Sequence, residues 1–171
     1  AHDLGLLSFW SANRDQPCAG GPQPWATSTC SSIAQSPFQF TGIFHGFTTG
    51  TWQDLGQAKS GTLGMPILQG SGPLFPGFLV SWTLSNVPGS ASAVLVAGAT
   101  AIYLPAGGGI LVPSPDVLIP WSTGPNGTAT ITVVWPAALP AGLALYFQAG
   151  IFDAGAAGGL SSSNALRLRT P

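Results

Sequence analysis

The sequence is poor in charged side chains. Its 171 residues contain four Lys or Arg and five Asp, there is no Glu, and the formal net charge is −1. Charged residues make up 5% of the chain, whereas they make up roughly a quarter of an ordinary globular protein. So few bases argue against a nucleic-acid partner, because binding to phosphates requires several Lys or Arg. Weak electrostatic repulsion between copies favours self-association.

Long apolar runs are absent as well. No uninterrupted apolar stretch reaches the roughly 18 residues of a membrane-spanning helix, so we expect no membrane span. The hydrophobic content of 45% argues against a disordered chain. The 24 glycines and 16 prolines lie between the apolar runs, which disfavours long helices and suits an all-β chain with many turns.

Cysteine is limited to Cys18 and Cys30, in a segment that resembles a loop. In an oxidising compartment they are predicted to form one disulfide, worth ~3 kcal/mol in the chain-entropy model. The alternative is two free thiols in a reducing compartment. The chain starts at Ala1 without Met or a basic leader, which is typical of a mature exported protein. We therefore expect a secreted protein, extracellular or at the cell surface.

Short stretches with alternating apolar and polar residues begin at Phe38. The clearest are 38–47, 77–86, 127–136 and 142–153. Alternation of this kind is typical of strands with one buried face. Nine or ten such strands, with turn residues between them and no convincing helix, predict an all-β fold: a two-sheet β-sandwich or jelly roll over 38–171. Residues 1–37 are expected to form an N-terminal arm and a disulfide-closed loop.

The stretch 127–136 has an unusual second face. Ala129, Ile131, Val133 and Trp135 alternate with Thr128, Thr130, Thr132 and Val134. A solvent-facing row in a soluble sheet usually includes Lys or Glu, and sheet edges are commonly protected by Lys or Pro. A face without charges predicts that something other than water covers it.

The segment "LGLLSFW" is apolar on both of its faces. As an extended strand it places Leu4, Leu6 and Trp10 on one side and Leu7 and Phe9 on the other. A mostly irregular connection separates it from the regular strands. We expect this assembly arm either to add to its own sheet or to complete the sheet of a neighbouring copy, as in donor-strand complementation.

Residues 62–171 resemble a β-sandwich module of secreted bacterial proteins. The resemblance lies in a Gly-led Thr/Ile/Val strand that ends in Pro, then a Gly, a "Leu-Tyr-x-Gln" group, an Asp and a closing "Ser-Asn-Ala-Leu" group. The matching residues are Gly127, Pro136, Gly142, Leu145, Tyr146, Gln148, Asp153, Ser163, Asn164, Ala165 and Leu166. The resemblance implies export and a β-sandwich, and it carries over no catalytic residues.

Two polar residues of this pattern have a physical interpretation. Asn164 follows a Gly/Ser loop and precedes a strand, so its amide is placed to bind loop backbone groups. Asp153 ends the preceding strand and is placed to accept hydrogen bonds from loop N–H groups. Loop fixation is the expected role of both. A Ca²⁺ site at Asp153 is the alternative, although one carboxylate is few for an ion that prefers six to eight oxygens.

No constellation of residues indicates catalysis, a metal or a cofactor. The five aspartates are scattered, whereas a typical glycosidase needs two nearby carboxylates. A Ser-His-Asp site would need His2 or His45, and no serine has a Gly-x-Ser-x-Gly context. Ala1 displaces His2 from the first position that copper oxygenases with an N-terminal histidine use. We expect no enzyme activity.

Aromatic residues leave a binding function open. Of the six tryptophans, Trp25 and Trp121 are expected in proline-rich loops and are the candidate platforms for stacking on a sugar ring. The leading hypothesis is an extracellular structural subunit that binds copies of itself by β-strand addition and forms a filament or surface layer. The alternatives are a secreted carbohydrate-binding module and a viral coat or decoration jelly roll.

Overall fold

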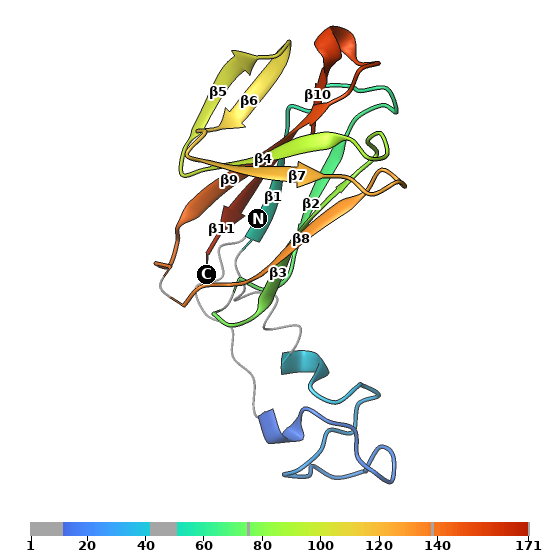
Figure 1. The fold of residues 1–171 in the computed structure, drawn as a ribbon. Helices are drawn as coiled ribbons and strands as arrows, with labels where there is room; N and C mark the ends of the chain where they lie inside the picture. Colours follow the sequence, from blue (N-terminus) through green and yellow to red (C-terminus); the bar gives the residue numbers. More distant parts are fainter. Residues whose placement is uncertain (1–11, 42–50, 75, 138, 171) are drawn as a thin grey trace. The chain divides into compact units, whose positions relative to one another are not determined.

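The computed structural model describes residues 12–41, 51–74, 76–137 and 139–170 (Figure 1). The chain divides into two compact units, residues 1–48 and 49–171, and each is described by itself. The described part of the first unit contains a 3₁₀ turn, η1 (Ala12–Arg14), and the disulfide Cys18–Cys30. The second unit is the predicted β-sandwich.

Two antiparallel sheets form the sandwich. The larger has the strand order β1-β11-β9-β4-β7, with β10 also paired to β9, and the smaller has the order β2-β3-β8. The larger sheet consists of β1 (Thr51–Gly56), β4 (Ser92–Gly98), β7 (Val117–Ser122), β9 (Ala144–Phe152), β10 (Leu160–Ser162) and β11 (Ala165–Arg169). The smaller sheet consists of β2 (Ile67–Ser71), β3 (Leu79–Ser85) and β8 (Ala129–Val134).

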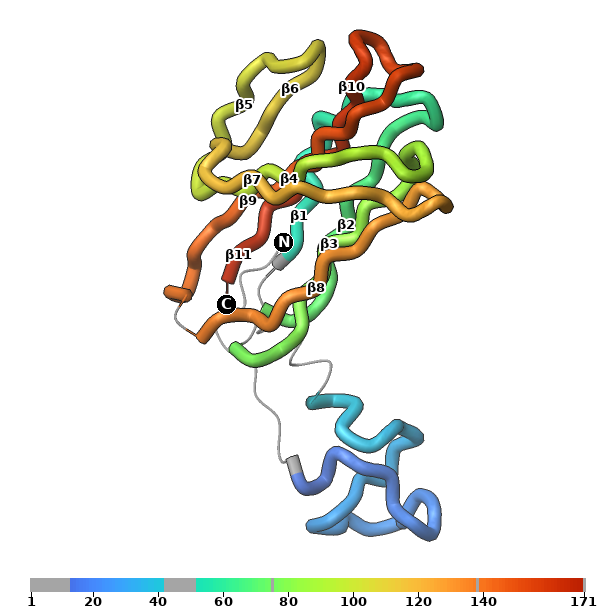
Figure 2. Tube along the Cα trace, viewed as in Figure 1, coloured from blue at the N-terminus to red at the C-terminus, as the bar shows by residue number. Residues whose placement is uncertain are grey.

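A separate hairpin and a second 3₁₀ turn complete this unit. The hairpin comprises β5 (Ala101–Ala106) and β6 (Gly109–Pro113), and η2 spans Ala157–Gly159. The hairpin leaves the larger sheet after β4 and returns to it at β7. Figure 2 follows this excursion along the chain trace.

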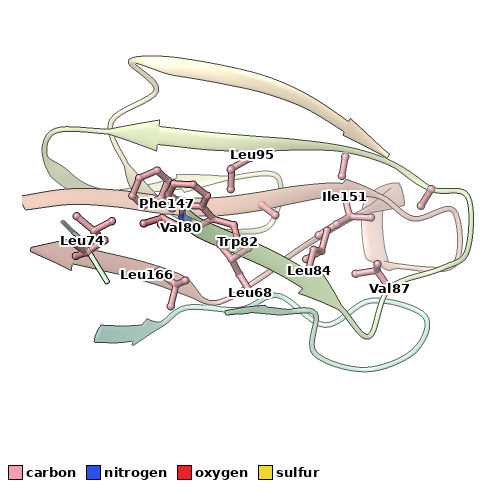
Figure 3. Packing of buried hydrophobic residues seen from close by; sticks show 14 of the residues in the cluster. Leu68, Leu74, Val80, Trp82, Leu84, Val87, Leu95, Phe147, Ile151 and Leu166 are labelled. Carbon is pink, nitrogen blue, oxygen red and sulfur yellow. The ribbon is translucent and has the colours of Figure 1, made fainter. Parts of the chain in front are cut away.

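The core lies between the two sheets and follows the expected alternation. On β3, Val80, Trp82 and Leu84 are buried while their neighbours in the strand are more exposed. The ring of Trp82 lies 4.9 Å from that of Phe147 on β9, centroid to centroid. Leu95 of β4 and Leu166 of β11 complete the packing seen in Figure 3. Burial of these apolar surfaces is the main force holding the sheets together.

The sheets are aligned so that β2 lies near β1 and β11. The ring of Trp52 on β1 packs so closely over Gly70 of β2 that a Cβ at Gly70 would lie 2.1 Å from a ring carbon. The opposite edges, β7 and β8, are connected by a short turn in which the Gly124 N–H donates to the Thr128 carbonyl at 2.8 Å. One side of the sandwich is therefore bounded by β7 and β8.

The expected strand over 38–47 is wrong at its start. Residues 39–41 form a helical turn, and the remaining residues of that stretch, 42–47, lie outside the described part. The backbone N–H groups of Phe40 and Thr41 donate to the Asp15 carboxylate at 3.0 and 2.5 Å. These bonds fasten residues 38–41 to the disulfide-containing unit, whose boundary accordingly falls after residue 48 and not after residue 37.

Candidate functional site

The free edge of β8 exposes backbone hydrogen-bonding groups. The Trp135 N–H donates to the Phe78 carbonyl at 2.7 Å, so the backbone of Trp135 points toward β3. The N–H and C=O groups of successive residues point to opposite sides of a strand, and the pairing of β3 with β8 has no register shift. The N–H and C=O groups of Thr130, Thr132 and Val134 therefore point away from β3. Among the described strands, none pairs with β8 on that side.

The outer face of the smaller sheet has hydroxyl groups in place of charges. Ser81 and Thr132 lie opposite each other with their hydroxyl oxygens 2.8 Å apart, and the hydroxyl oxygens of Thr83 and Thr130 are 3.1 Å apart. Strands β2, β3 and β8 contain no Asp, Lys or Arg. Because the hydroxyls bond to each other, the face offers little to repel a second uncharged surface.

Core-facing side chains remain partly exposed on the side bounded by β7 and β8. Ile119 and Val117 of β7 lie opposite Leu95 and Ala97 of β4, on the side that faces the core. They are nevertheless 37% and 53% exposed, and Val133 of β8 is 38% exposed. The smaller sheet ends at β8 and does not cover them. We call Val117, Ile119, Val133 and the outward backbone groups of β8 the open side.

The other edges of the sandwich carry protecting features. On β1, Asp54 adds a charge, and a register shift lies between Asp54 and Gly56. On β7, Pro120 lacks an N–H group. On β2, the backbone N–H and C=O of Leu68 are both bonded to the side chain of Asn164, at 2.7 and 3.1 Å. Strand β8 has no charge, no proline and no such cap.

Asn164 thus connects the two sheets. Its side chain is almost fully buried, and its amide mimics a strand by accepting from and donating to one residue of β2. The sequence places this amide near a loop, whereas its partner Leu68 belongs to a strand distant in sequence. No local pattern identifies that partner.

Asp153 fastens a loop. Its buried carboxylate accepts hydrogen bonds from the Thr62 N–H at 2.7 Å, the Thr62 hydroxyl, the Gly155 N–H at 3.2 Å and the Ser161 hydroxyl at 3.5 Å. Burial raises the pKa of Asp153, but the bonds from Thr62, Gly155 and Ser161 outweigh burial and hold it below the usual 3.8. Within the described residues, no group of three or more His, Cys, Asp or Glu could hold a metal ion.

Gln148 holds the β5–β6 hairpin against β9, a role that the alternation of its strand does not reveal. Its side chain accepts from the Val112 N–H at 2.9 Å and donates to the carbonyls of Ile110 and Ser163 at 3.0 Å. The alternation places it on the outward face, where the hairpin now buries it. In the sequence, only the "Leu-Tyr-x-Gln" group of the resemblance draws attention to Gln148.

An apolar cavity of about 210 Å³ lies beneath this hairpin. Val96, Ile110, Leu111 and Leu160 contribute to its lining. Lys59 borders it and donates from Nζ to the carbonyls of Gly107 and Ala157, both at 2.6 Å. The ammonium group thereby connects the hairpin tip to the η2 turn.

The first unit confirms the predicted disulfide and exposes one candidate platform. Cys18 and Cys30 are bonded, with their Cα atoms 5.0 Å apart. Trp25, inside the closed loop, is 65% exposed. Trp121, the other candidate, is half-buried on β7 and packs against the core cluster. Part of its ring is therefore covered by the core, whereas the ring of Trp25 is mostly exposed.

The remaining residues of interest lie outside the described part of the chain. They are the assembly arm, Leu4, Leu6, Leu7, Phe9 and Trp10, and both histidines, His2 and His45. The structure therefore adds nothing to the expectations for them. None of the described helices is long and apolar enough to cross a membrane.

Comparison with known proteins adds no relative. No family model, no curated protein and no solved structure matches this chain.

Proposed function

We propose that this protein is an extracellular structural subunit that assembles with copies of itself into a filament or surface layer by β-strand addition. The apolar segment Leu4–Trp10 of one copy would extend a sheet of the next. Such a head-to-tail contact produces open polymers when the rotation between successive copies does not close a ring.

The observation that carries this proposal is the apolar exterior of the sandwich. Among the large apolar side chains that are more than a third exposed are Ile67, Phe78, Leu79, Ile102, Tyr103, Leu104, Val117, Leu118, Ile119, Val133, Val134 and Phe152. Soluble monomers rarely expose large contiguous apolar patches, and this chain has few charges to keep copies apart. Contacts between copies would remove these side chains from water. The disulfide supports an oxidising location.

Sedimentation of the full-length protein over a range of concentrations, followed by electron microscopy, tests the proposal. We expect mass to increase with concentration and filaments or sheets to form. Replacing Leu6 and Leu7 with Asp in the full chain should abolish the polymers, because charges on both faces of the arm resist burial. Wild-type protein that stays monomeric at millimolar concentration would refute the proposal. Closed shells would instead indicate a coat protein.

Carbohydrate binding is a second candidate, supported by the exposed ring of Trp25. Flat aromatic rings that protrude from a rigid loop can stack on sugars, and the disulfide closes this loop. A glycan-array signal that disappears in Trp25→Ala, while Trp52→Phe retains it, would support this function. An array without any signal would exclude it for the glycans tested.

A further inference from the structure

We infer that the open side is the acceptor for the assembly arm of a second copy, with β8 as its hydrogen-bonding partner. This inference rests on the proposed function and specifies the contact by which it would operate. It makes the smaller sheet four-stranded, with the order β2-β3-β8-arm.

The choice of β8 follows from a comparison of the four sandwich edges. A strand added to β1 would meet the charge of Asp54 and a register shift. One added to β7 would meet the missing N–H of Pro120, and one added to β2 would have to displace Asn164 from Leu68. Addition to β8 displaces no partner among the described residues, and the outward groups of Thr130, Thr132 and Val134 would gain partners.

The arm has the length and pattern that this edge requires. Seven residues in a strand extend about 23 Å, and the six residues of β8 extend about 20 Å. An arm paired with β8 would turn one row of side chains toward Val117, Ile119 and Val133, which are core-facing yet incompletely covered. Its other row would lie on the uncharged outer face of the smaller sheet. The first row of the arm would cover these side chains, and the second row would lie beside Thr130, Thr132 and Val134, where no charge opposes it.

The proposed occupant is the arm of another molecule. The exposed apolar side chains of the sandwich favour association between copies, and the few charged residues oppose it only weakly. The chain has few charges, and none lies on β2, β3 or β8, so electrostatic repulsion would not keep the acceptor sheet of one molecule from the arm of another. The test below separates docking of the arm in another molecule from docking in its own.

Disulfide trapping reports the contact and the identity of the donor. One full-length variant carries Leu6→Cys in the donor arm, and a second carries Thr132→Cys as the acceptor. A third variant, with Gln53→Cys on the exposed edge β1, is the matched control acceptor. The chain has no cysteine beyond the bonded Cys18–Cys30 pair. After mixing and mild oxidation, we expect dimers between the first two variants, and at least about fivefold fewer with the control acceptor. Equal trapping at both edges would overturn the inference.

The double variant with Leu6→Cys and Thr132→Cys in the same chain distinguishes self-docking from exchange. Trapped multimers on a non-reducing gel support a second copy as donor. A trapped monomer as the main product at concentrations where the wild type polymerises would overturn that assignment. Cysteines placed in turn at Leu4 and Phe9 repeat the measurement in other registers.

A proline variant tests the backbone contact by itself. The Thr132 N–H points away from β3, so Thr132→Pro removes a donor that no described strand uses but that an added strand needs. We expect the critical concentration for assembly to rise about tenfold relative to Thr132→Val, which keeps the N–H. If polymers form as readily with Pro as with Val, β8 is not the acceptor, although the proposed function stands. Wild-type protein that never assembles would overturn both.

Discussion

Replacing Asn164 with Ala should be among the most damaging single changes in the sandwich. The substitution removes the only side chain that bonds both backbone groups of Leu68 in the described structure. Leu68 is fully buried and Asn164 nearly so, so water has little access to the groups left behind. The two sheets would lose a direct polar connection on the β2 side.

The expected decrease in the free energy of unfolding follows from the N–H and C=O groups of Leu68, which lose their partner. A buried backbone donor or acceptor without a partner costs about 1–3 kcal/mol. Two such groups, with some relief from local relaxation, give an expected loss of about 3 kcal/mol. That loss is a large fraction of the 5–15 kcal/mol that stabilises a typical domain. Asn126→Ala is the matched control, because among the described residues the Asn126 side chain bonds only Thr128, at an exposed turn. Its loss of stability should stay at ~0.5 kcal/mol.

Urea unfolding followed by tryptophan fluorescence measures the difference. Trp82 and Trp135 are buried in the sandwich and should report its unfolding. With a slope of about 2 kcal/mol per molar urea, the midpoint of Asn164→Ala should fall by about 1.5 M at an unchanged slope. Measurement at low protein concentration avoids a contribution from assembly.

Asn164→Asp provides a sharper test of the same reasoning. Aspartate keeps an acceptor for the Leu68 N–H but, when ionised, has no donor for the Leu68 carbonyl. Burial should raise the pKa of this carboxyl above its unfolded value, so stability should be lost as the pH rises through the raised folded pKa. Protonation at lower pH restores a donor. An Asn164→Ala midpoint equal to that of Asn126→Ala, or an Asn164→Asp variant insensitive to pH, would refute the sheet-connecting role.

Four further outcomes are expected. The folded pKa of Asp153 is lowered, so the stability that this carboxylate contributes should be complete above pH 3.8 and lost as the pH falls through the folded value; Asp153→Asn should show a flatter acid-unfolding profile. Reduction of Cys18–Cys30 should destabilise the first unit by about 3 kcal/mol, seen as faster proteolysis of residues 12–41 with the sandwich intact. Trp121→Ala should destabilise the sandwich by about 3 kcal/mol, measured by urea unfolding, because its ring packs on the core. Polymers should persist when NaCl is raised from about 0.05 to about 0.5 M, measured by pelleting, because screening weakens only charge-mediated contacts.

Alternation in the sequence predicts the sandwich core well, because burial of one strand face is a local signal with a period of two. Val80, Trp82 and Leu84 face inward as their spacing indicates. The segment that starts at Phe38 has a similar alternation, yet its first residues form a helical turn. Hydrogen bonds to Asp15 determine the conformation of this segment. Because Asp15 lies far earlier in the chain, these bonds produce no periodic pattern in the sequence.

The candidate site is harder to predict because it depends on which strands become edges. The uncharged row of Thr130 and Thr132 is visible in the sequence and predicts an unusual surface. The sequence does not show that β8 ends its sheet or that β7 extends beyond it. Gln148 and Asn164 illustrate the same limit, since their partners lie in strands or hairpins that only the fold brings near.

Five of the eight charged side chains in the described part of the chain bond to backbone groups of their own molecule. All four described aspartates accept hydrogen bonds from backbone N–H groups; they are Asp15, Asp54, Asp116 and Asp153. Lys59 donates to two carbonyls. These groups fix loops, turns and the β5–β6 hairpin, and none lies on the smaller sheet. The sequence thus places charge where the fold needs polar anchors and omits it from the face and edge where a neighbouring strand would bind. The proposed strand addition requires this absence of charge, because one Lys or Glu on β8 would suffice to discourage the contact.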